Sequence, residues 1–184
     1  MTYIIGIDLS WSSTGIVCGR ENQDNPKYTT SVQLNQHNKK HTMSIFKEFL
    51  NPDKSTNSLY VIEDYNRGGA YQNPNSLIAM AELRGILELF LEDVCSEATA
   101  SIIYVAPTQL KKFITGSGKG DKAQIMKEVY KRWKFDAKNS DEADAFGLFK
   151  IGYHLIKPNN NDLIKPQQEV LDKLYNKYKL VLEN

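Results

Sequence analysis

The sequence has few cysteines and no long apolar run. Its two cysteines, Cys18 and Cys95, lie far apart and lack partners at metal-ligand spacing, which excludes a disulfide framework and a cysteine-bound metal. We interpret both as core thiols, because free cysteine is usually buried. No run of 18 apolar residues occurs, and the apolar N-terminal stretch contains Asp8, which argues against a membrane span and a secretory signal. We therefore expect a cytoplasmic protein with no membrane partner.

The chain also lacks an excess of charge of either sign. Its 23 basic and 22 acidic residues give a net charge of +1, which alone does not indicate a nucleic-acid partner. The distribution is uneven, however, because eight basic residues and only two acidic ones lie between Lys111 and Lys134. This local excess predicts a surface that could face phosphates.

The length limits the number of domains. A chain of 184 residues, 41% of them hydrophobic, can bury one sizeable core but is short for two ordinary domains. We expect one domain over residues 1–156, with residues 157–184 as a C-terminal helical extension of it. No internal repeat is visible.

The order of apolar patterns predicts a mixed α/β fold. Residues 3–7, 15–19 and 28–34 are typical of an antiparallel strand meander. A helix over 42–50, a strand ending at Glu63, a helix over 74–94 and a strand over 101–105 should follow. The helix over 74–94 is apolar on most of its circumference, so we expect it to be buried in the core or in a dimer interface.

The rest of the chain is predicted to be helical. We expect helices over 107–114, from Asp121 to about Arg132, over 139–155 and from Pro166 to Leu182, with a glycine-rich loop, TGSGKG, over 115–120. The predicted architecture is an α/β, RNase H-like mixed five-stranded sheet with helices on both faces.

Four carboxylates occupy positions that suit a metal site. Asp8 and Glu63 each end an apolar strand, and Asp141 and Asp144 are spaced to share one helix face. Singly, each has an ordinary explanation: Asp8 could cap a turn, Glu63 could pair with Arg67, and Asp141 could complement a helix dipole. If the fold gathers them, like charges about 5 Å apart repel by roughly 3 kcal/mol at an effective dielectric of 20, so a cation is needed. Oxygen ligands favour Mg²⁺ or Mn²⁺, and two such ions can drive phosphodiester hydrolysis.

Five motifs in order make a family resemblance specific. They are GIDLSxxSTG with Asp8, VIED with Glu63, ELRG at 82–85, VAPTQLKKFITGSGKGDKAQIM, and DEADAF with Asp141 and Asp144. Over residues 3–155 the chain resembles the RuvC-type Holliday junction resolvases. The resemblance implies catalysis and metal binding by Asp8, Glu63, Asp141 and Asp144, with two Mg²⁺ ions for which Mn²⁺ can substitute. It also implies a homodimer that makes paired nicks in branched DNA such as four-way junctions and Y-forks.

The lysines around the glycine-rich loop are candidate DNA contacts. They are Lys111, Lys112, Lys119 and Lys122, and the resemblance supports them because the family carries DNA-contacting lysines in the corresponding stretch. The glycines would let backbone amides approach a phosphate. The alternative is a solvated lysine-rich surface. A nucleotide P-loop is excluded, because Phe113 replaces its first glycine and Gly120 replaces its Ser or Thr.

Further candidates for DNA binding lie in the segment that follows Glu63. Resolvases of this type carry an aromatic residue there that stacks on junction bases, and Tyr65, Arg67 and Tyr71 lie near that position. The match is inexact, because Asn66 stands three residues after the glutamate. Both tyrosines could equally be packing residues.

We therefore expect a metal-dependent endonuclease that resolves Holliday junctions and other branched DNA. Two alternatives stay open: an RNase H-type nuclease acting on RNA–DNA hybrids, and a non-catalytic protein that binds branched DNA. An actin-like ATPase also has a GIDLSxxSTG-like loop, but 184 residues leave no room for its second half.

Overall fold

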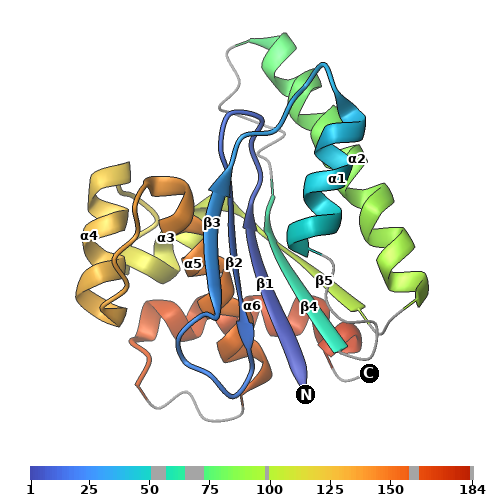
Figure 1. Cartoon of the computed structure of the whole chain (residues 1–184). Helices are drawn as coiled ribbons and strands as arrows, with labels where there is room; N and C mark the ends of the chain where they lie inside the picture. The colour runs from blue at the N-terminus through green and yellow to red at the C-terminus, as the bar shows by residue number, and fades with distance from the viewer. Residues whose placement is uncertain (51–56, 65–72, 98–99, 158–161, 183–184) are drawn as a thin grey trace.

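The computed structural model describes residues 1–50, 57–64, 73–97, 100–157 and 162–182. Its strands are β1 (Thr2–Asp8), β2 (Thr14–Arg20), β3 (Tyr28–Val32), β4 (Asn57–Glu63) and β5 (Ala100–Val105). Its helices are α1 (Lys39–Leu50), α2 (Pro74–Glu97), α3 (Pro107–Thr115), α4 (Lys122–Trp133), α5 (Ser140–Ile156) and α6 (Lys165–Leu182). The strands form one sheet in the order β3-β2-β1-β4-β5, antiparallel from β3 to β1 and parallel from β1 to β5 (Figure 1).

The sheet separates two cores, because successive side chains of a strand point to opposite faces. On one face, strand residues such as Ile4, Val17 and Val61 pack with residues of α3, α4, α5 and α6. On the other face, strand residues such as Ile5 and Ile62 pack with α1 and α2. We call these the α5-side core and the α2-side core. The predicted mixed five-stranded sheet with helices on both faces is confirmed.

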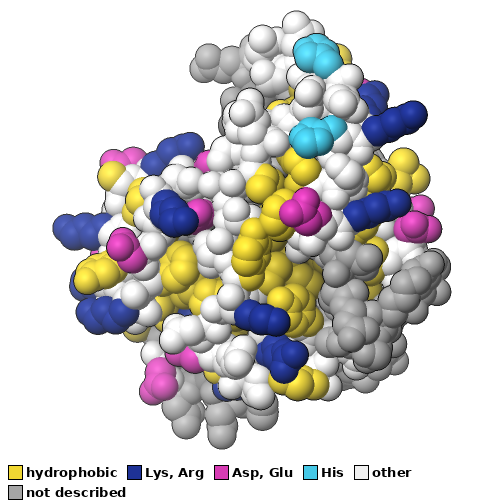
Figure 2. All heavy atoms as spheres, in the orientation of Figure 1, with side chains coloured by type: hydrophobic (Ala, Val, Ile, Leu, Met, Phe, Trp, Pro, Cys, Tyr) yellow, Lys and Arg dark blue, Asp and Glu magenta, His cyan; other side chains and the backbone are white. Residues whose placement is uncertain are grey.

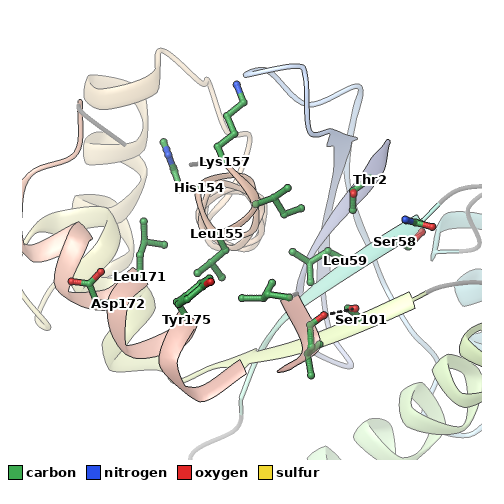
Figure 3. A pocket seen from close by; sticks show the side chains of 14 residues that line it. Thr2, Ser58, Leu59, Ser101, His154, Leu155, Lys157, Leu171, Asp172 and Tyr175 are labelled. Atoms are coloured by element: carbon green, nitrogen blue, oxygen red, sulfur yellow. Dashed lines mark hydrogen bonds between the residues drawn. The ribbon is translucent and has the colours of Figure 1, made fainter. Parts of the chain in front are cut away.

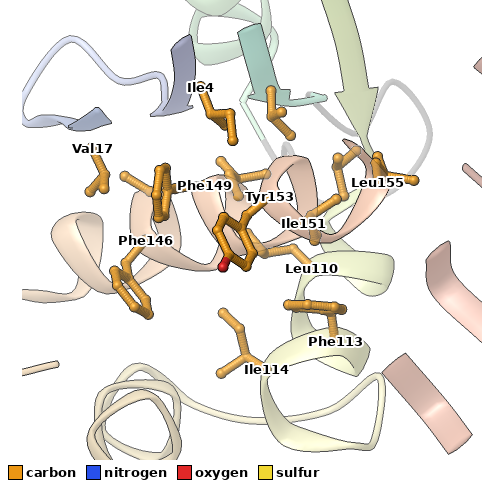
Figure 4. Packing of buried hydrophobic residues seen from close by; sticks show 14 of the residues in the cluster. Ile4, Val17, Leu110, Phe113, Ile114, Phe146, Phe149, Ile151, Tyr153 and Leu155 are labelled. Atoms are coloured by element: carbon orange, nitrogen blue, oxygen red, sulfur yellow. The ribbon is translucent and has the colours of Figure 1, made fainter. Parts of the chain in front are cut away.

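Helix α5 is the centre of the α5-side core. Figure 4 shows its aromatic side chains lying between the strands and the helices α3 and α4. Phe146 and Phe149 are fully buried, and the Phe146 ring stacks on Phe135 with the ring centroids 4.1 Å apart. Burying such a side chain stabilises the fold by about 1.5–3 kcal/mol. This packing fixes α5 on the sheet.

Glycines allow α5 to lie directly on the strands beneath it. A Cβ atom at Gly6 of β1 would lie 2.3 Å from the carbonyl oxygen of Ala145, and one at Gly15 of β2 would lie 2.1 Å from that of Asp141. At Gly152 a Cβ would lie 2.7 Å from the side chain of Ile4. Since such distances are far below van der Waals contact, only glycine fits these positions. The first turn of α5 is thereby held beside the end of β1.

Helix α6 packs on the α5-side core and covers the edge of β5. Val170, Leu171 and Leu174 are buried in that core. The Tyr178 hydroxyl accepts a hydrogen bond from the backbone N–H of Tyr104 at 3.1 Å and donates to its carbonyl oxygen at 3.2 Å. Backbone groups of an edge strand are thus satisfied by a side chain of the C-terminal helix.

Several sequence expectations need small corrections. Strand β3 ends at Val32 rather than at residue 34, because the Leu34 amide donates to the carbonyl oxygen of Trp11 at 3.0 Å instead of extending the ladder. Cys18 is buried as expected, but Cys95 is only partly buried. Within the described residues, no helix is both long and apolar enough to cross a membrane.

Candidate active site

Two strands bring Asp8 and Glu63 together. Strands β1 and β4 are parallel neighbours, and Ile7 pairs with Ile62, so the next residue of each strand is one of the two acids. Both carboxylates point to the α5 face, because they continue the alternation that places Ile4 and Val61 in the α5-side core. The strand ends that carry Asp8 and Glu63 therefore lie side by side.

The first turn of α5 carries the other two acids. Asn139 caps the helix by accepting a hydrogen bond from the Glu142 amide at 2.9 Å, and its amide group donates to Ser31 Oγ of β3 at 2.9 Å. Glu142 is 3% exposed and accepts from the Lys138 amide at 2.9 Å, so it is engaged in the cap. Asp141 and Asp144 are left on the side of the helix that faces the strand ends.

The pKa values show that the four acids interact. Burial, followed by the charges of Glu63 and Asp141, raises the pKa of Asp8 well above its usual range. Burial and the Asp144 charge raise the pKa of Glu63 to about 7, and burial with the charges of Asp8 and Asp141 raises the pKa of Asp144 to about 7. A hydrogen bond between these two carboxyl groups also raises the pKa of Asp8 and lowers that of Glu63. Acids with such shifted pKa values are typical of functional sites.

Two of the four candidate lysines lie at the carboxylates. Lys122 Nζ is 3.9 Å from Asp141 Oδ1, although its side chain is 80% exposed. The charge of Lys111 lowers the pKa of Glu63 and of Asp144, against the larger effect of burial. Both lysines therefore add positive charge to the edge of the acidic cluster.

The other candidates are placed differently. Lys119 is exposed in the glycine-rich loop, whereas Lys112 donates to Glu169 of α6 at 2.5 Å and so is engaged in holding α6. The remaining three, Tyr65, Arg67 and Tyr71, lie outside the described residues. Basic side chains also gather on the side of the molecule where α4 lies, as Figure 2 shows in the orientation of Figure 1.

The glycine-rich loop is held by its own hydrogen bonds. Thr115 Oγ1 donates to the Lys111 carbonyl oxygen at 2.8 Å and accepts from the Ser117 amide at 3.1 Å. Gly116 has a φ of 82°, which favours glycine, and Asp121 caps α4 by accepting from the Gln124 amide at 2.8 Å. The predicted helix therefore starts next to Asp121, and the loop presents Lys119 from an ordered turn.

The donor atoms fit a divalent cation. Asp144 Oδ1 is buried and has no hydrogen-bond partner among the described residues. Among the described residues, no three Asp, Glu, His or Cys side chains are arranged as a group that could hold a metal ion. The unpaired oxygen and the mutual repulsion of the acids nevertheless favour a bound cation, because buried carboxylates need a positive partner. An all-oxygen donor set selects a hard cation.

A cavity of about 520 Å³ lies elsewhere, at the opposite end of the sheet. Figure 3 shows it between the C-terminal end of α5, helix α6 and the first residues of the strands, among them Thr2 and Ser58. The carboxylates lie at the other ends of β1 and β4 and at the start of α5. None of the candidate site residues that the structure describes lines this cavity.

Comparison with known proteins identifies the family. The model of the crossover junction endodeoxyribonuclease RuvC family matches residues 4–151. The chain belongs to the RuvC family. The RuvC of Rhodopirellula baltica is 29% identical over 87 residues, which cover 46% of this chain and 47% of that protein. The aligned part thus spans about half the length of this relative.

Solved structures share the fold of this RuvC-family chain. Thermus thermophilus RuvC in complex with a Holliday junction substrate matches with a TM-score of 0.58 and 11% identity, covering 84% of this chain and 94% of that one. The yeast mitochondrial Holliday junction resolvase matches with a TM-score of 0.55 and 14% identity, covering 96% and 83%. At these identities the likeness establishes the RNase H-like fold.

The sequence alone predicts no role for one charged residue near the site. Arg84, within the ELRG motif, is only 7% exposed and lies with its Nη1 3.7 Å from Asp64, the residue after Glu63. The spacing of Arg84 and Glu88 indicates a helical ion pair, but the contact with Asp64 depends on the tertiary fold.

Proposed function

We propose that this protein is a metal-dependent endonuclease that resolves Holliday junctions and other branched DNA by paired phosphodiester nicks. The observation that carries the proposal is the convergence of Asp8, Glu63 and Asp144, with their raised pKa values, on the face where Asp141 lies. Membership of the RuvC family, whose description is crossover junction endodeoxyribonuclease, supports the reaction class.

Asp8, Glu63, Asp141 and Asp144 would hold two Mg²⁺ ions, and Mn²⁺ would substitute. When bound, the metal supplies an activated water and stabilises the leaving oxygen of an in-line displacement. The protein's own part is to hold four oxygen-bearing side chains on rigid elements. Lys122, beside Asp141, adds a positive charge at the point where a phosphate would approach.

The basic residues near the carboxylates would bind the DNA backbone. Lys111, Lys119 and Lys122 are placed for this role, because two of them adjoin the acids and the third projects from the ordered loop. Lys112 is the weakest of the four candidates, since Glu169 already engages it. Thermus thermophilus RuvC has been solved on a Holliday junction, which supports branched DNA as the partner.

Paired nicks in opposing strands need two active sites, which supports a homodimer. Helix α2 exposes an apolar stripe in which Ile78 is 66% exposed and Leu89 is 65% exposed. Gly85 lies between them, and a Cβ atom there would meet nothing within 4 Å. These three positions share one helix face, so a second copy could pack closely on it. We also propose that residues 157–184 belong to the same domain, as the burial of Leu171 and Leu174 supports.

Cleavage of defined substrates tests the function. End-labelled four-way junction, Y-fork, linear duplex and RNA–DNA hybrid are incubated with Mg²⁺, Mn²⁺ or EDTA, alongside the variant Asp144→Asn. We expect metal-dependent, symmetric nicks confined to branched DNA, with cleavage lost but junction binding retained in the variant. Cleavage of the hybrid alone would move the protein to the RNase H branch, and no cleavage at all would contradict the proposal.

A further inference from the structure

The end of strand β4 carries two adjacent carboxylates that point to opposite faces of the sheet. Glu63 continues the positions of Leu59 and Val61 in the α5-side core, so it faces α5. Asp64 continues the positions of Tyr60 and Ile62 in the α2-side core, so it faces α2. Whatever holds Asp64 therefore also sets the direction in which Glu63 points.

Arg84 of α2 contacts Asp64 from the α2 face of the sheet. Its Nη1 lies 3.7 Å from Asp64 Oδ1, and its Nε donates to Glu88 Oε1 at 2.8 Å. The guanidinium carbon lies 3.6 Å from the centre of the Tyr104 ring of β5, and the Tyr104 hydroxyl donates to Glu88 Oε1 at 3.4 Å. A nearly buried cation is thus compensated by two carboxylates and an aromatic face.

Both ends of this network are anchored. The Asp64 amide donates to the carbonyl oxygen of Val105 at 2.8 Å, which extends the pairing of β4 with β5 by one bond. Tyr104, on which Arg84 stacks, is fixed through its backbone by the Tyr178 hydroxyl of α6. The end of β4, helix α2 and strand β5 therefore meet around the guanidinium group, and α6 holds the backbone of β5. This arrangement is more elaborate than a surface ion pair requires.

We infer that Arg84 is a positioning residue for the active site: by holding Asp64 on the α2 face, it keeps Glu63 directed at the acids of α5. This inference rests on the proposed function, because it makes Glu63 a metal ligand. No contact between Arg84 and the four acids of the site is seen among the described residues, so Arg84 acts on Glu63 through the last peptide of β4. Residues that orient metal ligands typically change metal affinity or activity by about 10–100-fold when they are replaced.

Lysine should not replace arginine here. A lysine would retain the charge, but it cannot stack on Tyr104 while it also reaches Asp64 and Glu88, because its charge is a single point. Asp64→Asn is the second test variant, since it leaves the buried guanidinium in place and changes a side chain that is 41% exposed. This variant should fold even if a change at Arg84 does not.

The test measures Mn²⁺ affinity by calorimetry and single-turnover nicking of a four-way junction. We compare wild type, Arg84→Lys, Arg84→Gln, Asp64→Asn and the double variant Asp64→Asn with Arg84→Gln.

Each single change should lower both the Mn²⁺ affinity and the nicking rate by about tenfold or more, while junction affinity in Ca²⁺ stays within about twofold. The double variant should be no worse than the worse single variant, because both changes break one interaction. The control is Glu82→Gln, which lies on the same helix as Arg84, removes the ion pair with Lys39 of α1 and should leave Mn²⁺ affinity unchanged.

The outcomes separate the inference from the proposed function. If the wild type binds Mn²⁺ and nicks junctions while the variants lose only thermal stability, Arg84 has a structural role and the inference is wrong. Additive losses in the double variant would also overturn it. A wild type that binds Mn²⁺ without nicking branched DNA contradicts the proposed function, and the Mn²⁺ measurements on the variants then still decide the role of Arg84.

Discussion

At the scale of single residues, Asp144 shows how a site can oppose folding. Its carboxyl group has a pKa raised to about 7, chiefly by burial, and its Oδ1 has no hydrogen-bond partner among the described residues. A carboxyl whose folded-state pKa is raised favours the folded state only while it is protonated. This contribution is fully present below the unfolded-state pKa of about 4 and is lost as the pH rises through about 7.

We predict that Asp144→Asn stabilises the metal-free protein at pH 8. The amide is neutral and similar in shape, so it removes the cost of a buried charge, which is on the order of 1–3 kcal/mol. Urea unfolding in EDTA measures the effect, and the gain should shrink as the pH falls toward 4. Asp136→Asn, at an exposed position, is the control that should change little. A variant less stable than wild type at pH 8 would show that Asp144 is favourably paired in the folded state.

Metal binding should depend on pH for the same reason. Glu63 and Asp144, with pKa values raised to about 7, must lose their protons to bind a cation. We predict that Mn²⁺ affinity rises as the pH is raised from 6 to 8 and that binding at pH 6 releases protons. Calorimetry in buffers of different ionisation enthalpy measures that release. Affinity independent of pH over this range would contradict the raised pKa values of these two carboxyl groups.

At the scale of elements, the sequence predicted most of the fold because its apolar patterns are strong. The strands containing Asp8 and Glu63 and the helix containing Asp141 were placed nearly as the structure has them. Helix α1 begins at Lys39, three residues before the predicted start, because Asn38 accepts from the His41 amide at 3.1 Å and caps the first turn. Local patterns thus predicted the elements, whereas short polar caps shifted their ends.

The sequence could not predict how closely α5 approaches the sheet. Gly6 and Gly15 belong to different strands, and only the register that pairs Asp8 with Gly15 places both beneath one helix. The same limit applies to Arg84, whose contact with Asp64 joins two elements that are far apart in the sequence. Contacts of this kind depend on strand register and packing, which a single sequence does not specify.

We predict that Gly15→Ala damages both stability and the site. The new methyl group would lie 2.1 Å from the Asp141 carbonyl oxygen, so α5 must shift away from β2. Overpacking of this kind costs about 1–3 kcal/mol or more, and the shift would move Asp141 away from Asp8. Urea unfolding and Mn²⁺ calorimetry measure the two effects. Gly118→Ala, where a Cβ would meet only an ordinary contact at 3.6 Å, is the control. Unchanged Mn²⁺ affinity in Gly15→Ala would show that the site tolerates a displaced helix.

At the scale of the whole molecule, the sheet and α5 extend from the carboxylates at one end of the strands to the cavity at the other end. The carboxylates gather where β1 and β4 end, and the cavity lies where these strands begin. Helix α6 covers the edge of β5 beside that cavity, whereas the apolar stripe of α2 lies on the opposite face of the sheet. A second copy packed on α2 would therefore leave the acids, which face α5, accessible to metal ions and DNA.

We predict that Leu89→Glu yields a monomer that nicks junction strands one at a time. The side chain is 65% exposed in the single chain, so the change should leave the fold intact while it places a charge in the proposed interface. Sedimentation velocity measures the mass. A supercoiled plasmid with an extruded cruciform reports pairing, because paired nicks linearise it whereas single nicks relax it and reabsorb the cruciform. Leu180→Glu, at a position 80% exposed on α6, should remain dimeric and produce linear plasmid. If Leu89→Glu keeps the mass and the linear product of the wild type, the two active sites are brought together by a different surface.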